Sequence, residues 1–136
     1  WLAYQFTENG NKVCYMASQP EKAEGNYTRR GEIFALITHR PAENTKNVFS
    51  YITGYTYKPD SEVSVDIGDR TFTLFTENDR AWTPDDATDN ALAQAVRQGS
   101  KMIVRGTSSR GTQTTDTFSL SGSAAAHDAI SRACGV

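Results

Sequence analysis

The stretch Glu62-Val63-Ser64-Val65-Asp66-Ile67 carries the clearest structural pattern of this chain, because apolar and polar residues alternate along it. Successive side chains of a strand point to opposite faces, so the apolar residues share one face and the polar residues share the other. Gly68-Asp69 follows as a two-residue turn, and Thr71-Phe72-Thr73-Leu74 begins a returning strand. A hairpin with one buried and one solvated face predicts an antiparallel sheet.

Most of the remaining chain also has the composition of strands separated by polar turns. Residues 19–31 are hydrophilic and predict a mobile loop, and residues 108–113 form the turn of a second hairpin. The other predicted strands lie within residues 1–7, 12–18, 32–38, 48–57, 101–107 and 114–121.

Two segments predict short helices. Thr83-Pro84-Asp85-Asp86 combines an N-cap hydroxyl, a proline in the first turn and acidic residues at the positive end of the helix dipole. That helix is expected to end near Arg97, before Gly99, and a final helix is expected over residues 123–133. The prediction is therefore a single domain, residues 1–136, that is all-β (β-rich): an antiparallel β sandwich or partly open barrel with two short helices.

Two cysteines, Cys14 and Cys134, lie near opposite ends of a chain that opens on Trp1 rather than Met. The simplest interpretation is a processed, exported domain with a disulfide between them, formed in an oxidising compartment. Closing a loop of roughly 120 residues stabilises a fold by about 4–5 kcal/mol in the chain-entropy model. The alternative is a pair of buried free thiols in a cytosolic protein.

Composition argues against several classes of function. The formal net charge is −2, whereas non-specific binding to nucleic acid usually needs a basic excess. No apolar run approaches the roughly 20 residues of a membrane span. The acidic residues at 85, 86 and 89 lack the spacing of a calcium loop, and we expect neither a metal nor a cofactor.

His39 is the one residue placed suitably for a general base, because it stands where a strand enters a loop. With a nearby Ser and Asp it would form a hydrolase, yet the nucleophile-elbow pattern G-x-S-x-G is absent. A structural or surface histidine is the preferred interpretation of His39. His127, on the final helix, is expected to be solvated.

An aromatic row and a set of basic residues suggest a partner surface. Phe49, Tyr51, Tyr55 and Tyr57 share one parity and could form a ladder of rings, which is either ordinary core or an exposed surface for sugars or a partner. The basic residues could bind an acidic partner or an anionic sugar polymer, or belong to a mixed solvated surface. They are Arg29, Arg30, Arg40, Lys101, Arg105 and Arg110.

Several stretches, in this order along the chain, carry a family resemblance: Trp1, residues 38–41 with 49–55, residues 99–112, residues 116–122, and the Ala-rich segment to Cys134. Together they resemble the invasion-associated locus B family of bacterial envelope proteins. The resemblance implies a small β-rich protein of Gram-negative bacteria, periplasmic or secreted, associated in pathogenic members with host-cell invasion. It brings no catalytic residue and no cofactor.

These observations favour a non-enzymatic envelope protein, in the periplasm or at the outer surface, that binds a protein or cell-wall partner. The predicted surface combines residues 40–57 with residues 108–113. A hydrolase that uses His39 is the alternative, and a purely structural envelope component is the third. The candidate contact residues are Arg40, Tyr51, Tyr55, Tyr57 and Arg110.

Overall fold

The alternating stretch forms the hairpin that its pattern predicts. In the computed structural model, which describes residues 1–136, β6 (Glu62–Ile67) pairs in antiparallel register with β7 (Arg70–Glu77). Val63 and Val65 are fully buried, while the polar residues between them lie on the other face. The burial of these apolar side chains fixes the register, since a slip by one residue would turn them toward water.

This hairpin belongs to one ten-stranded sheet in which every pairing is antiparallel, in the order β1-β2-β4-β5-β8-β7-β6-β9-β10-β3. The edge strands β1 and β3 do not pair with each other, so the sheet is not a closed barrel. The predicted β-rich antiparallel fold is confirmed. The other strands are β1 (Leu2–Glu8), β2 (Asn11–Ser18), β3 (Lys22–Gly25), β4 (Phe34–Arg40), β5 (Thr45–Ile52), β8 (Arg80–Trp82), β9 (Lys101–Thr107) and β10 (Gln113–Ser119).

Two α-helices and one short 3-10 helix complete the fold: α1 (Asp86–Gln98), α2 (Ser123–Cys134) and η1 (Pro41–Glu43). The N-cap of α1 is Asp85, whose carboxylate accepts a hydrogen bond from the Thr88 N–H, so the prediction of Thr83 as the cap is wrong. The Thr83 hydroxyl instead donates to the Asp89 carboxylate one turn into the helix. Both threonine and aspartate cap helices well. Because the Thr83 hydroxyl is bonded to the buried Asp89 carboxylate, Asp85 takes the cap position.

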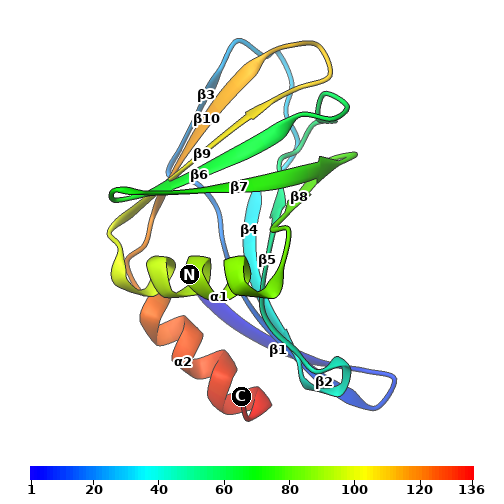
Figure 1. The fold of residues 1–136 in the computed structure, drawn as a ribbon, viewed down its shortest axis with the longest axis vertical. Helices are drawn as coiled ribbons and strands as arrows, with labels where there is room; N and C mark the ends of the chain where they lie inside the picture. The colour runs from blue at the N-terminus through cyan, green and yellow to red at the C-terminus, as the bar shows by residue number, and fades with distance from the viewer.

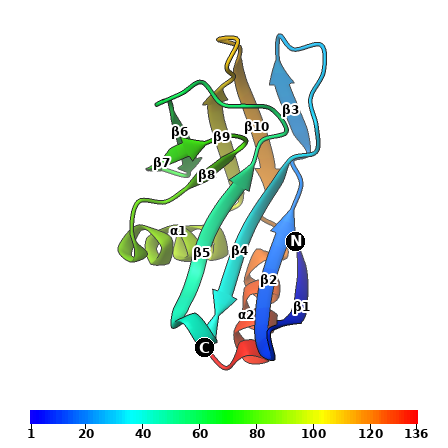
Figure 2. The same ribbon diagram turned by 90° about the vertical axis from the view of Figure 1, so that its right-hand side faces the viewer.

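Both α-helices pack on the same side of the sheet. Figure 2 shows β1, β2, β4 and β5 toward the viewer with α1 and α2 behind them. Leu92 and Val96 of α1 and Ile130 of α2 join one core with the inward residues of the strands, including Phe49. The outward face of these strands carries partly or largely exposed rings, such as Tyr4 stacked on Tyr15 at 5.0 Å between centroids.

The predicted disulfide is present. Cys14 on β2 is bonded to Cys134 at the end of α2, across a sequence separation of 120 residues. The bond holds the last helix against β2, the strand that α2 contacts more than any other. It therefore closes nearly the whole chain into one covalent ring.

Residues 19–31, predicted as a mobile loop, are more ordered than their composition suggests. β3 adds a short edge strand to β10, with Glu24 opposite Thr115. Arg30 places its guanidinium inside the protein, where its side chain is only 3% exposed. The prediction is wrong for these parts of the segment, because β10 supplies an open edge and a buried carboxylate that the local sequence does not reveal.

Candidate functional site

Tyr55 and Arg110, two of the predicted contact residues, line the same hollow. It lies beside the β9–β10 turn, at the top of Figure 1, and has a volume of about 570 Å³. None of its lining residues is acidic. The lining consists of Asn26, Tyr27, Thr28, Arg29, Tyr55, Thr56, Ser108, Ser109, Arg110, Thr112 and Thr114.

The hairpin side of the hollow is held by hydrogen bonds. The Ser108 hydroxyl accepts from the backbone N–H of Arg110 at 3.3 Å and of Thr112 at 3.1 Å. The Ser109 N–H donates to the Thr56 carbonyl at 2.8 Å. The turn is thus closed on itself and tied to the segment that carries Tyr55, which fixes the backbone from which Arg110 projects.

The chain next to Arg29 and Tyr55 is also fixed, at the point where Gly31 and Gly54 meet. The Gly31 N–H donates to the Gly54 carbonyl at 2.8 Å. Gly54 has a φ of +80°, and a Cβ there would collide with the Gly31 carbonyl oxygen. Only glycine meets both conditions without strain, so the crossing of these two segments depends on Gly54.

A buried ion pair lies beneath the hollow. The Arg30 guanidinium donates to both carboxylate oxygens of Asp116, at 2.7 and 2.6 Å, and its Nε donates to the Thr53 carbonyl at 2.8 Å. The Tyr51 hydroxyl donates to the same carboxylate at 2.5 Å. We call Arg30, Tyr51, Thr53 and Asp116 the arginine cluster.

The arginine cluster also orients the aromatic rings of the hollow. The guanidinium carbon of Arg30 lies 5.4 Å from the ring centroid of Tyr27 and 5.0 Å from that of Tyr55. Burial opposes the charge of Arg30, but the hydrogen bonds and attraction of Asp116 outweigh it and raise the arginine pKa. The result is a permanent cation between the two rings, an arrangement that stabilises both.

Two other predicted contact residues are unsuitable for binding. Tyr51 has no exposed surface and Tyr57 is 3% exposed, so the prediction that they contact a partner is wrong. Tyr51 and Tyr57 share their parity with Phe49, and all three side chains belong to the hydrophobic core. For these three residues the aromatic row is therefore ordinary core and not an exposed surface. Burial raises the pKa of both tyrosines, and the Tyr57 hydroxyl has no hydrogen-bond partner.

Arg40, the remaining candidate, does not join the hollow. It ends β4 beside η1, at the bottom of Figure 2, whereas the β9–β10 turn lies at the top. Its guanidinium is paired with Glu8 at 3.1 Å. The structure therefore brings Tyr55 and Arg110 together and leaves Arg40 at the other end of the molecule.

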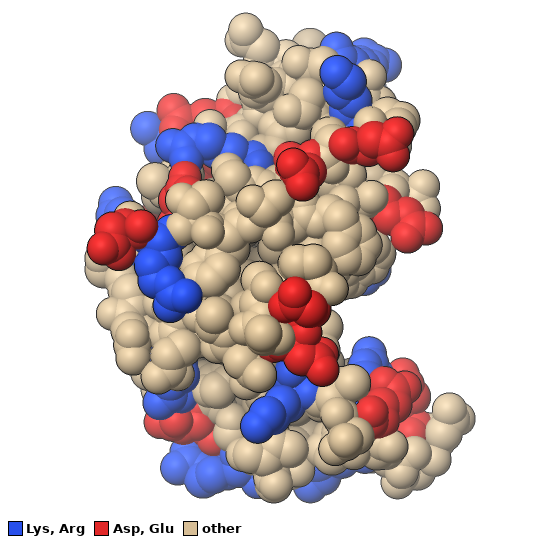
Figure 3. Space-filling view, viewed as in Figure 1, with Lys and Arg blue, Asp and Glu red and all other residues tan.

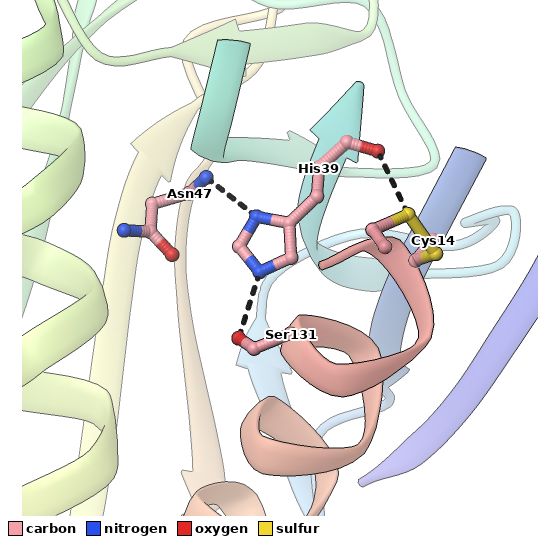
Figure 4. The surroundings of a disulfide bond; sticks show 5 residues. Cys14, His39, Asn47 and Ser131 are labelled. Carbon is pink, nitrogen blue, oxygen red and sulfur yellow. Dashed lines mark hydrogen bonds between the residues drawn. A yellow bond between two sulfur atoms is a disulfide. The ribbon is translucent and has the colours of Figure 1, made fainter. Parts of the chain in front are cut away.

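His39 is buried in a second polar cluster (Figure 4). A register shift between β4 and β5 gives Asn47 a φ of +57°, and the Asn47 N–H donates to His39 Nδ1 at 3.0 Å. His39 Nε2 lies 3.1 Å from the Ser131 hydroxyl of α2. The ring centroids of His39 and His127 are 5.4 Å apart. We call His39, Asn47, His127 and Ser131 the histidine cluster.

The hydrogen bonds of His39 define its chemistry. A neutral imidazole whose Nδ1 accepts a backbone N–H carries its proton on Nε2, so His39 donates to Ser131. A general base needs an unprotonated nitrogen facing the hydroxyl, and here the nitrogen facing Ser131 is the protonated one. Burial, with the neighbouring His127 and Lys46, lowers the pKa of His39 to about 4.

His127 is partly buried, so the prediction of a solvated histidine is wrong. Its Nδ1 accepts from Arg97 at 3.0 Å, and its Nε2 donates to the Asn47 amide oxygen at 2.7 Å. Burial first, then Arg97, lowers its pKa. Both histidines are thus held neutral by burial and by partners that use their unprotonated nitrogens.

Sequence reasoning missed the buried role of Asp116. Asp116 alternates in step with Thr114 and Phe118 on β10, and all three are buried. The parity of Phe118 was therefore a signal that placed Asp116 inside, where a carboxylate needs a cation. No group of three or more His, Cys, Asp or Glu side chains is arranged to hold a metal ion, and neither helix is long and apolar enough to span a bilayer.

Comparison with curated proteins and with solved structures gives no match. A family model does match, and it covers residues 1–131 of the chain. This range includes both polar clusters and the hollow around Tyr55 and Arg110, and it leaves out Cys134, so the disulfide comes from the structure. The match together with the β-rich fold establishes that this chain belongs to the family of the Invasion associated locus B (IalB) proteins.

Proposed function

We propose that this protein is a non-enzymatic envelope protein, in the periplasm or at the outer surface of a Gram-negative bacterium. It binds a protein or cell-wall partner through the hollow around Tyr55 and Arg110. Membership of the IalB family supports a location in the bacterial envelope. The disulfide supports an oxidising compartment, where such bonds form and persist.

The observation that carries the binding function is the meeting of separate segments at one hollow. Residues 26–29, 55–56 and 108–114 all contribute, and the hydrogen bonds of Ser108 and Ser109 hold the turn in place. A site that is formed before binding loses little conformational entropy when its partner arrives. Arg110 is exposed beside the hollow, and arginine is among the residue types enriched at interfaces.

The proposal assigns no catalytic residue. The enzymatic alternative gains one contact, His39 with Ser131, but the proton on Nε2 leaves the serine without a base. In this proposal the histidine cluster serves the packing of α2 on β4.

Crosslinking in intact cells tests the proposal. The tagged protein is compared with its Arg110→Ala variant and with Arg132→Ala, a control that removes the same charge from the exposed end of α2. We expect one reproducible envelope or host partner, captured by the wild type and by the control and lost from Arg110→Ala. Equal capture by all three would remove the hollow from the proposal, and no specific capture would favour a purely structural component.

A further inference from the structure

The hollow continues on both sides into an open groove. One neighbouring depression is lined by residues 25–26 and 111–113, and another by residues 28–31 with Gly54. Each shares two residues with the central hollow. A surface that continues past the central hollow suits an extended chain better than a single small molecule.

The groove carries unpaired positive charge. Arg29 and Arg110 line the hollow from opposite segments, and neither forms an ion pair within the protein. Elsewhere the two signs of charge are mixed, as the face in Figure 3 shows, and the net charge is −2. Two free guanidinium groups at a site without carboxylates indicate a ligand that carries carboxylate or similar anionic groups.

The remaining lining of the hollow resembles a site for sugars more than a site for peptide side chains. Hydroxyl groups of Thr28, Thr56, Ser109 and Thr112 line the hollow and can both donate and accept, as sugar hydroxyls require. The hydroxyls of Ser108 and Thr114 are already hydrogen-bonded within the protein. The apolar lining is limited to the rings of Tyr27 and Tyr55. A docked peptide draws its affinity from apolar anchors in well-packed pockets, which this groove does not offer.

The fixed aromatic rings fit the same ligand class. Arg30 holds both tyrosines from inside, and the Tyr55 hydroxyl is fixed 2.7 Å from the Thr114 hydroxyl. Fixed aromatic faces suit the C–H faces of sugar rings.

We propose that the groove binds an acidic glycan, a sugar chain whose carboxylate groups are held by Arg29 and Arg110. This inference rests on the proposed function and names the ligand class of the same site. The sugar hydroxyls bond to the Ser and Thr side chains, and the chain runs along the groove past Tyr27 and Tyr55.

Calorimetric titration of the oxidised protein tests this inference. The probe is an oligomer of galacturonic acid, and its methyl ester is the matched neutral probe. We expect the acid to bind, the ester to bind at least about tenfold more weakly, and Arg29→Ala and Arg110→Ala each to weaken the acid by about tenfold or more. Arg132→Ala should bind as the wild type does.

Two further probes identify the source of the glycan. Binding of hyaluronan oligomers would support the proposal and indicate an animal glycan, and binding of muramic-acid-containing glycan fragments would support it and indicate the bacterial wall. Poly-glutamate that binds as tightly as the sugar acid would overturn the proposal in favour of an acidic peptide. Equal affinities for the galacturonic acid oligomer and its methyl ester would also overturn the proposal.

The glycan class and the proposed function fail in different ways. If no sugar acid binds but cells still give a partner that depends on Arg110, the ligand class is wrong and the binding function stands. If the sugar acid binds equally well to Arg29→Ala and Arg110→Ala, the groove is not its site.

Discussion

The arginine cluster and the histidine cluster are both buried and polar, and each joins segments far apart in the sequence. They differ in charge, because the first contains an ion pair and the second contains only neutral groups. The first pairs a cation with a carboxylate through two hydrogen bonds, and a tyrosine completes it. The second consists of two neutral rings, an amide and a hydroxyl. The first supports the groove, and the second attaches α2 to the sheet.

Because of this difference, the two ends of the molecule should respond to different changes. Arg30 keeps its charge at any pH at which the protein is folded, because arginine does not lose its proton. Buried neutral histidines resist protonation only down to their lowered pKa. Acid should therefore loosen the α2 end, whereas loss of one charge should loosen the groove end.

The largest effect is expected from removing the disulfide beside the histidine cluster, where Cys134 Sγ lies 4.0 Å from the His39 carbonyl (Figure 4). Cys14→Ala with Cys134→Ala should lower the free energy of unfolding by about 4–5 kcal/mol, because the unfolded chain regains its freedom. Urea unfolding measures this. A loss below about 1 kcal/mol would mean that packing alone holds α2.

The next effect belongs to the arginine cluster. Asp116→Asn leaves Arg30 buried without its anionic partner and should lower stability by about 3–5 kcal/mol. Replacing both residues, Arg30→Met with Asp116→Leu, should recover much of that loss because no charge remains buried. If the double variant is no more stable than Asp116→Asn, the penalty does not come from the unpaired charge.

Acidification should act mainly through the histidine cluster. The His39 pKa is about 4 in the folded protein and 6.5 ordinarily. The unfolded chain therefore takes up a proton first, and stability falls as the pH drops from about 6.5 to about 4. The difference between these two pKa values corresponds to a loss of stability on the order of 3 kcal/mol. Urea unfolding at several pH values measures the slope.

The His39→Asn variant is the control for this slope. Its stability should fall less steeply over the same pH range, because the contribution of His39 is gone. His127, whose pKa burial also lowers, keeps a contribution of the same sign, and Asp89, whose pKa burial raises, gives the opposite sign. Equal slopes for the wild type and His39→Asn would assign the acid sensitivity to other groups.

The smallest effects separate two tyrosines that share the same buried environment. Tyr51→Phe removes a hydrogen bond to a buried carboxylate and should lower stability by about 1–3 kcal/mol. Tyr57→Phe removes a hydroxyl that has no partner, so stability should stay the same or rise by about 1 kcal/mol. Thermal unfolding of the two variants side by side checks the difference, and equal losses would contradict it.

Short sequence patterns predicted correctly those features that depend mainly on neighbouring residues or on residue counts. Alternation at residues 62–67 predicted a real hairpin, the Gly99 signal predicted the end of α1, and the cysteine count predicted the disulfide. The order of the strands in the sheet was not predicted, because pairings such as β5 with β8 depend on tertiary packing.

The candidate site was predicted in part, for a physical reason. Tyr55 and Arg110 meet because an isolated bridge joins Tyr57 to Ser108, and no local pattern announces such a contact. The same bridge draws Tyr57 inward. Parity could group Tyr51 with Tyr57 but could not say which face is buried. Arg40 lies at the other end because it ends β4, whereas Tyr55 follows β5, which runs back antiparallel to β4.

The ring closed by Cys14 and Cys134 has a consequence for proteases. A single cut in an exposed turn between the two cysteines, such as at Gly111, leaves both pieces covalently joined. The nicked molecule would run as one species on a gel until a reductant is added, and only then separate into fragments. In an oxidising compartment, such damage would leave the protein as one molecule.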